Sequence, residues 1–216
     1  MILVPVKNLR HAKQRLAAVL DQASRTQLAE AMITDVLQTL AAWQERPEVA
    51  VVTSDSFVQD LARQLDFHII ADDNRGETDA IETATATCVA MGAASSLVIP
   101  GDIPLIEVSD LQAIERAAPD RGSVLVPAAD GRGTNAAYRN PATLFPLRFG
   151  NDSFQPHFRT AKAAGFPCIV LSLPSIALDI DNPADLQELA TAPGQRRSQL
   201  LVRQWHLRDY PLAANE

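Results

Sequence analysis

The sequence predicts a single α/β domain in which helices flank a mixed, mostly parallel sheet. Short apolar segments rich in β-branched residues recur along the 216 residues. They are too short for helices and almost continuously apolar, as strands buried on both faces are. Amphipathic segments with helical spacing lie between them. Regular alternation of strands and helices is the pattern of the α/β class.

The expected strands are distributed over most of the chain. They are ILVPV (2–6), VAVVT (49–53), HIIA (68–71), LVIP (97–100), VLVP (124–127) and CIVLSL (168–173). After residue 127, DGRG resembles a hairpin turn and leads into a further strand, TNAAYR (134–139). We expect this strand to pair antiparallel with the one before it, which makes the sheet mixed.

Helices are expected between these strands, from apolar spacing and from capping residues. Apolar residues three and four apart mark helices through residues 28–40 and 58–65. Gly165 is expected to end a helix, and Asn182 to cap one whose first residue is Pro183. A hydroxyl followed three residues later by an amide predicts two capping boxes, Ser24 with Gln27 and Ser109 with Gln112.

Length and composition indicate one folded domain over residues 1–192, with 193–216 as a C-terminal tail. The tail mixes charged and apolar residues, which suits a surface helix or a contact between subunits. The net charge of -7 argues against a nucleic-acid partner, because phosphate-tracking surfaces carry an excess of lysine and arginine. Any anionic ligand is therefore expected to be held by a few local groups.

Cysteine content and hydropathy point to the cytoplasm. Two isolated cysteines, Cys88 and Cys168, are too few for a disulfide framework or a zinc cluster. No stretch reaches the roughly 18 apolar residues of a membrane span, and the first residues lack the charged region of a signal peptide. We expect a cytoplasmic protein that has no membrane partner.

The clearest chemical signal is a set of aspartates just after expected strands. Asp102 follows LVIPG, and Asp179 and Asp181 bracket one isoleucine. In an extended chain, the side chains of residues i and i+2 point to the same side and lie about 7 Å from each other. Three carboxylates at the ligand-binding edge of a sheet suit Mg²⁺, which prefers oxygen ligands. The alternative is that they are turn residues, solvated loop residues or helix caps.

Basic residues follow the first strand, in VPVKNLRHAKQRLA. Lys7, Arg10, Lys13 and Arg15 would border the same crevice and could hold a triphosphate, although helix-borne lysines and arginines often simply face solvent. Gly76 lies in a loop before an expected helix, where backbone amides can receive an anion. The sequence contains no P-loop, strand-linked GxGxxG, GxSxG or HExxH motif.

Five motifs in order resemble a known family. They are VPVKNLRHAKQRLA, PGDIPLI, GTNAAYR, FGNDSFQPHF and LDIDNPADL. Over residues 1–190 the chain resembles the 2-phospho-L-lactate guanylyltransferases of deazaflavin coenzyme F-420 biosynthesis, a family that includes enzymes activating phosphoenolpyruvate or 3-phospho-D-glycerate. The resemblance implies a Rossmann-like nucleotidyltransferase fold, with GTP and a small phosphorylated acid as substrates. A downstream transferase of that pathway is a possible partner.

The resemblance also implies roles for particular residues. It implies that the metal is bound by Asp102, Asp179 and Asp181. It implies that the acid is bound by Thr134, the backbone of Gly150 and Ser153, and that the nucleotide is bound by Lys7 and Lys13. Without the resemblance, Thr134 reads as an ordinary strand residue and Ser153 as a helix cap. Gly76, Glu77, Thr78 and Asp79 depart from the family's glycine-rich pattern after the third strand, which leaves the choice of acid open.

The implied reaction joins two polyanions, so charge neutralisation dominates it. A phosphate oxygen of the acid attacks the α-phosphorus of GTP, and pyrophosphate leaves. Mg²⁺ bound at Asp102, together with Lys7 and Lys13, would offset the negative charge of the phosphates. A phosphate ionised at pH 7 needs no general base, so none of His11, His68, His157 and His206 need be catalytic. His157 lies near the expected acid site, where a structural role is an equal alternative.

Other functions fit part of the same pattern. One is a nucleotidyltransferase that acts on a sugar phosphate or a molybdopterin. Another is a regulatory protein that binds GTP without turnover. A third uses Asp102 as a phosphoacceptor in a doubly wound receiver-like or phosphatase-like fold.

Overall fold

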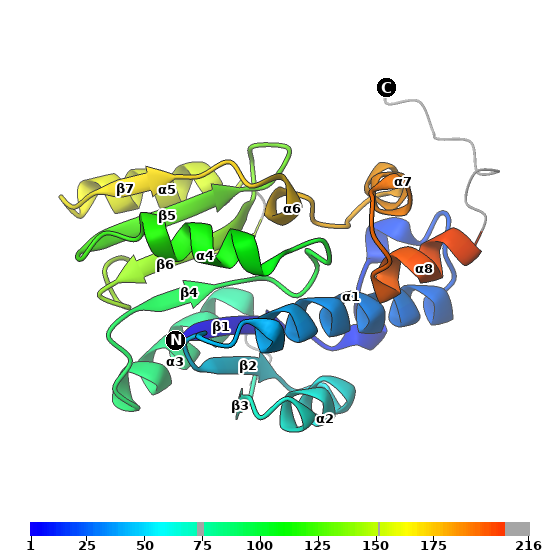
Figure 1. Cartoon of the computed structure of the whole chain (residues 1–216), viewed down its shortest axis with the longest axis horizontal. Helices are drawn as coiled ribbons and strands as arrows, with labels where there is room; N and C mark the ends of the chain where they lie inside the picture. The colour runs from blue at the N-terminus through cyan, green and yellow to red at the C-terminus, as the bar shows by residue number, and fades with distance from the viewer. Residues whose placement is uncertain (73–75, 151, 206–216) are drawn as a thin grey trace.

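The computed structural model describes residues 1–72, 76–150 and 152–205, and in these ranges it contains one sheet of seven strands (Figure 1). The strands are β1 (Ile2–Val6), β2 (Val49–Thr53), β3 (His68–Ile70), β4 (Ser96–Val98), β5 (Gly122–Pro127), β6 (Thr134–Asn140) and β7 (Cys168–Val170). The α-helices are α1 (Gln22–Ala42), α2 (Ser56–Gln64), α3 (Glu77–Ala90), α4 (Val108–Ala117), α5 (Phe154–Ala163), α6 (Pro174–Ala177), α7 (Pro183–Thr191) and α8 (Arg197–Gln204). Two 3-10 helices, η1 (Leu9–His11) and η2 (Gln14–Leu16), follow β1.

The sheet has the strand order β3-β2-β1-β4-β6-β5-β7. The strands β1, β2, β3 and β4 run parallel, β6 is antiparallel to β4 and β5, and β7 is parallel to β5. The prediction of a mixed, mostly parallel sheet is confirmed. The chain winds outward from β1 to β3 and then returns to the other side of β1 as β4. Loops that leave β1 and β4 therefore diverge, which opens a crevice at their carboxyl ends.

Alternating residues of the strands supply two apolar layers. On β1, Val4 contributes to the layer that contains α1, α2 and α4, whereas Leu3 faces the layer that contains α3 and α5. In Figure 1, α1 and α4 lie in front of the sheet, and α3 and α5 lie behind it. Coverage on both faces explains why the strands are nearly continuous apolar runs.

Two of the expected helix starts are wrong by a few residues. The N-cap of α1 is Asp21, whose carboxylate accepts a hydrogen bond from the Ser24 amide at 2.7 Å. Helix α4 is capped by Glu107 together with Asp110, and not by Ser109 with Gln112. At α1 a carboxylate earlier in the chain starts the helix before the serine. At α4 the Asp110 carboxylate accepts a hydrogen bond from the Glu107 amide at 2.8 Å, which places the cap two residues before Ser109. The cap at Asn182 with Pro183 after it is confirmed.

The last expected strand is also shorter than predicted. It ends at Val170, because the chain turns after Leu171 and starts α6 at Pro174. The helix expected to end at Gly165 is α5, with Gly165 just beyond its last turn at φ +77°. A left-handed residue in this place is the usual end of a helix.

The segment expected as a tail contains α8, which packs against α1 and α7 (Figure 1). The buried Asp35 of α1 accepts hydrogen bonds from the Arg197 and Ser198 amides, both at 2.9 Å, and so caps α8 across the interface. Val202 joins an apolar cluster with residues of α1 and α7. Residues 206–216, which include His206, lie outside the described residues. No helix in the described part of the chain is long and apolar enough to cross a membrane.

Candidate active site

A cavity of about 660 Å³ opens at the carboxyl ends of β1 and β4, where the strand order reverses. Its walls come from segments far apart in the sequence: the loop after β1, the loop after β4, the start of β6 and the stretch between α6 and α7. The cavity is lined by the residues with predicted metal-, acid- and nucleotide-binding roles, Lys7, Lys13, Gly76, Asp102, Thr134, Gly150, Ser153, Asp179 and Asp181. Arg10 and Arg15, which were also expected to border the crevice, are not among its lining residues. Asn151 of FGNDSF and residues 73–75 before Gly76 lie outside the described residues.

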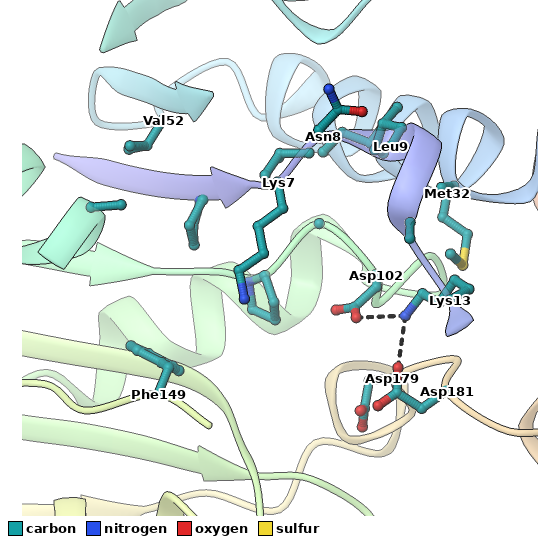
Figure 2. Close-up of a pocket in the computed structure, with 18 of the residues that line it drawn as sticks. Lys7, Asn8, Leu9, Lys13, Met32, Val52, Asp102, Phe149, Asp179 and Asp181 are labelled. Atoms are coloured by element: carbon teal, nitrogen blue, oxygen red, sulfur yellow. Dashed lines mark hydrogen bonds and ion pairs between the residues drawn. The ribbon is translucent and has the colours of Figure 1, made fainter. Parts of the chain in front are cut away.

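The loop after β1 carries both lysines and is anchored at its base. Asp55, which is buried at the N-cap of α2, accepts a hydrogen bond from the Leu9 amide at 3.0 Å. Between η1 and η2 the chain turns sharply, and Lys13 adopts a left-handed conformation at φ +54°. The turn sends the Lys13 side chain inward, while Lys7 extends from the end of β1 across the cavity (Figure 2).

Asp102 lines the cavity from the loop after β4, which packs tightly against α1. A Cβ atom on Gly101 would come within 2.9 Å of Ile33 Cδ1 and 3.3 Å of Val6 Cγ2, so only glycine allows this approach without a shift. The carbonyl of Asp102 accepts a hydrogen bond from the Ile180 amide at 3.2 Å. This bond ties the loop after β4 to the segment that carries Asp179 and Asp181.

A substitution at Gly101 should therefore disturb the site through packing alone. We expect Gly101→Ala to lower the free energy of unfolding by about 1–3 kcal/mol, since an added methyl must displace its neighbours. Ile33→Val removes the Cδ1 atom in the way, so the double variant should be less damaged than the sum of the two single variants. Thermal unfolding of the four proteins measures this coupling, and strict additivity would contradict the close approach.

Lys13 joins two of the three aspartates. Its Nζ atom lies 2.7 Å from Asp102 Oδ2 and 2.9 Å from Asp181 Oδ1 (Figure 2), and Arg15 Nη1 lies 3.2 Å from Asp181 Oδ2. The Lys13 side chain is only 7% exposed. Burial alone would lower the pKa of this amine, but the charges of Asp102 and Asp181 outweigh it and raise the pKa. Lys13 is therefore a fixed positive charge at neutral pH.

The two later aspartates differ in their electrostatic environment. Burial opposes ionisation of both. For Asp181, Lys13 and Arg15 more than compensate, and the pKa is held below its ordinary value. For Asp179, burial and the nearby charges of Asp102 and Asp181 raise the pKa, against a hydrogen bond from Asn135. Asp179 thus lacks a cationic partner strong enough to offset its desolvation.

Asn135 is a site residue that we did not assign from the sequence. Its Nδ2 atom lies 3.0 Å from Asp179 Oδ1 and also within hydrogen-bonding distance of the carbonyls of Ile176 and Ala177. The amide fixes the Asp179 carboxylate and the end of α6 against β6. Its place next to Thr134 in the motif GTNAA was the available signal, but only the fold brings it to residue 179.

The donor set fits a hard divalent cation, although the carboxylates are not gathered as a finished metal site. Within residues 1–72, 76–150 and 152–205, no three His, Cys, Asp or Glu side chains stand in a metal-binding arrangement. The ammonium of Lys13 lies between Asp102 and Asp181. Asp179 is close enough to both carboxylates for their charges to raise its pKa. The three side chains offer only oxygen atoms as ligands, and Mg²⁺ prefers oxygen ligands.

Two hydroxyls and a glycine also line the cavity. Thr134 at the start of β6 and Ser153 before α5 are buried, with 3.3 Å between their Oγ atoms. The ring of His157 contacts Thr134 Oγ1 at 2.9 Å, from behind the wall. Gly150 has φ +136°, a conformation that L side chains rarely adopt, and Phe149 beside it faces the cavity (Figure 2). Phe149 was also absent from our sequence-based assignment.

The strand order and this pocket lined by lysines and aspartates define a protein of the Rossmann-like nucleotidyltransferase class. The family model described as "Guanylyl transferase CofC like" matches residues 1–208. The chain belongs to this CofC-like guanylyl transferase family, and the resemblance seen in the sequence is confirmed.

Individual relatives agree with the family match. The chain is 37% identical over 206 residues to the phosphoenolpyruvate guanylyltransferase of Roseiflexus castenholzii, covering 95% of each protein. It is 31% identical over 189 residues to the 3-phospho-D-glycerate guanylyltransferase of Colwellia psychrerythraea, covering 88% of this chain and 90% of the relative.

Solved structures confirm the fold. A candidate nucleotide-diphospho-sugar transferase from Desulfovibrio desulfuricans G20 superposes with a TM-score of 0.80 at 19% identity, covering 97% of this chain and 96% of that one. A cytidylyltransferase from Leptospira borgpetersenii superposes with a TM-score of 0.58 at 12% identity, covering 94% and 92%. At these identities the likeness extends to the fold alone.

Proposed function

We propose that the protein is a Mg²⁺-dependent guanylyltransferase that joins GTP to a phosphorylated three-carbon acid and releases pyrophosphate. The acid is 3-phospho-D-glycerate, phosphoenolpyruvate or 2-phospho-L-lactate, and the reaction belongs to coenzyme F-420 biosynthesis. One observation carries the proposal: two lysines, three aspartates and two buried hydroxyls line a single cavity at the switch point of the sheet. The names of the relatives support guanine and the class of acid.

Each wall of the cavity suits one substrate. The lysine side, with Lys7 and Lys13, suits the triphosphate, because ammonium groups offset its charge and that of the departing pyrophosphate. We assign Gly76, at the N-terminus of α3, to the same nucleotide, since helix amides attract anions. Thr134, Ser153 and the backbone of Gly150 suit the phosphorylated acid, because all three offer short, fixed hydrogen-bonding groups.

The reaction forms one bond and breaks one. An oxygen of the acid's phosphate attacks the α-phosphorus of GTP in line, and the bond from that phosphorus to the β-bridging oxygen breaks with its electron pair leaving on pyrophosphate. Asp102, Asp179 and Asp181 would hold Mg²⁺, which supplies charge neutralisation at the α-phosphate. The protein otherwise acts by positioning the two phosphates and by offsetting their charge. No proton need be removed from the attacking oxygen, since a phosphate is ionised at neutral pH.

Both cysteines are free in the structure, which is consistent with a reducing cytoplasm, where we place the protein. A downstream transferase that accepts the guanylylated acid is the partner that the proposed reaction requires. The exposed Leu200 of α8 is a candidate contact for an oligomer formed through the C-terminal segment.

A substrate panel tests the proposal. The protein is incubated with Mg²⁺, GTP and each of the three acids in turn, with inorganic pyrophosphatase present to draw the reaction forward, and phosphate release is followed. We expect release from GTP that depends on at least one acid, is much weaker with ATP, and stops when Mg²⁺ is chelated. Release that depends on a sugar phosphate and on none of the acids would contradict the proposal, as would tight GTP binding without turnover.

A further inference from the structure

We propose that His157 is a positioning residue that commits the Thr134 hydroxyl to donate its proton into the cavity, toward the phosphorylated acid. This inference rests on the proposed function, in which Thr134 binds that acid. The ring of His157 lies behind Thr134 and does not line the cavity.

The partners of the ring define where its proton lies. Nε2 is 2.8 Å from the backbone nitrogen of Arg148, and because a backbone N–H can only donate, Nε2 must be the unprotonated nitrogen that accepts. A neutral imidazole has one N–H, so that proton is on Nδ1. Nδ1 lies 2.9 Å from Thr134 Oγ1 and therefore donates to it.

The surroundings keep the ring neutral. His157 is 1% exposed. Burial, together with the charge of the buried Arg139, lowers the pKa of His157 to about 4, so the ring carries a single proton at neutral pH. Phe149 packs edge to face against the His157 ring, with 5.1 Å between the ring centroids. This contact holds the plane of the His157 ring from the cavity side. The tautomer and the orientation of His157 are thus fixed from several sides.

The consequence falls on the hydroxyl of Thr134. Its oxygen accepts from His157 Nδ1 and is also within 3.3 Å of Ser153 Oγ, which donates to it. A hydroxyl has one proton and two acceptor sites, so an oxygen that accepts twice must direct its proton elsewhere. Thr134 lines the cavity, and the oxygens of a phosphate or carboxylate at neutral pH accept hydrogen bonds only. Without the Nδ1–H donor, the acceptor site that it occupies on Thr134 Oγ1 is open, the threonine proton is free to turn away from the cavity, and a lone pair can face the anion.

Two substitutions separate the functions of the ring. His157→Asn retains an N–H donor at the position of Nδ1, and His157→Gln can accept from Arg148 at the position of Nε2 but lacks the Nδ1 donor. We expect His157→Gln to raise the KM for the acid about tenfold, the effect of a lost hydrogen bond to a charged group, and to leave the KM for GTP within about twofold. His157→Asn should restore most of the affinity for the acid.

A double-mutant cycle with Thr134→Val shows whether His157 acts through the threonine. Once the hydroxyl is absent, His157→Gln should raise the KM for the acid no further. An equal rise in both backgrounds, or an equal defect in His157→Asn, would overturn the inference and leave a structural role. A normal KM for the acid in Thr134→Val, with acid-dependent turnover intact, would refute the role of Thr134 while the guanylyltransferase reaction stands.

A spectroscopic measurement tests the tautomer without activity. Nitrogen-15 NMR of the unliganded wild-type protein, with the His157 signals identified by their loss in His157→Asn, should show Nδ1 protonated and Nε2 unprotonated at neutral pH. The opposite assignment, or a doubly protonated ring, would overturn the inference. A panel in which no acid is turned over would refute the proposed function itself, whatever the state of the ring.

Discussion

Asp102→Asn is expected to lower kcat about 10²–10³-fold with any acid that the enzyme accepts. The substitution keeps the size of the side chain but removes one charge from the set of aspartates proposed to act at the α-phosphate, and removal of one fixed electrostatic group from an active site has an effect of this order. It also removes the 2.7 Å ion pair to the buried Lys13. Steady-state rates of pyrophosphate release at saturating GTP measure the change.

Asp60→Asn is the matched control for this variant. This substitution also removes one negative charge, but on the exposed surface of α2, where Asp60 pairs with Arg63 at 2.6 Å. We expect its kcat to stay within about twofold of the wild type, because exposed ion pairs contribute little. Turnover by Asp102→Asn at the wild-type rate would show that this carboxylate takes no part in the chemistry.

Lys13→Met is expected to reduce kcat/KM for GTP by about 100-fold or more. The buried ammonium holds Asp102 and Asp181 together and adds positive charge beside the predicted triphosphate site. With the ammonium removed, Asp102 loses its 2.7 Å ion pair, and Asp181 keeps only the exposed Arg15 of its two basic partners. Initial rates over a range of GTP concentrations at a fixed, saturating acid concentration measure the loss.

Two further variants separate charge from backbone effects. The chain has three lysines, and Lys162 on α5 lies outside the cavity, so Lys162→Met serves as the charge control and should keep its activity. Lys13→Gly relieves the left-handed backbone at φ +54° and also removes the ammonium. We expect it to be inactive yet at least as stable as Lys13→Met. Activity in either Lys13 variant within threefold of the wild type would refute the role of the ammonium.

The sequence predicted the sheet and the place of the site because both depend on local patterns. Buried strands are continuous apolar runs, and Asp102 stands directly after one of them, so its position at the carboxyl edge followed from the strand alone. The family motifs then added Thr134, Gly150 and Ser153. All of them line the cavity.

Contacts across long stretches of chain could not be predicted in the same way. Lys13 meets Asp102 and Asp181 across 89 and 168 residues, and the turn that directs it inward depends on a left-handed backbone that lysine rarely adopts. The hydrogen bond between Asn135 and Asp179 likewise forms only once α6 packs beside β6. At the start of α1, the cap predicted at Ser24 lies at Asp21, whose carboxylate accepts a hydrogen bond from the Ser24 amide.

The most direct test of the central claim follows the oxygens of the acid through the reaction. The acid is prepared with oxygen-18 in its phosphate, and the reaction with GTP and Mg²⁺ is followed by phosphorus-31 NMR and mass spectrometry. The proposed attack on the α-phosphorus predicts a guanylylated acid with a new diphosphate linkage that retains all of the label, and pyrophosphate that contains none. Label in the released pyrophosphate or phosphate, or consumption of GTP without any diphosphate-linked product, would contradict it.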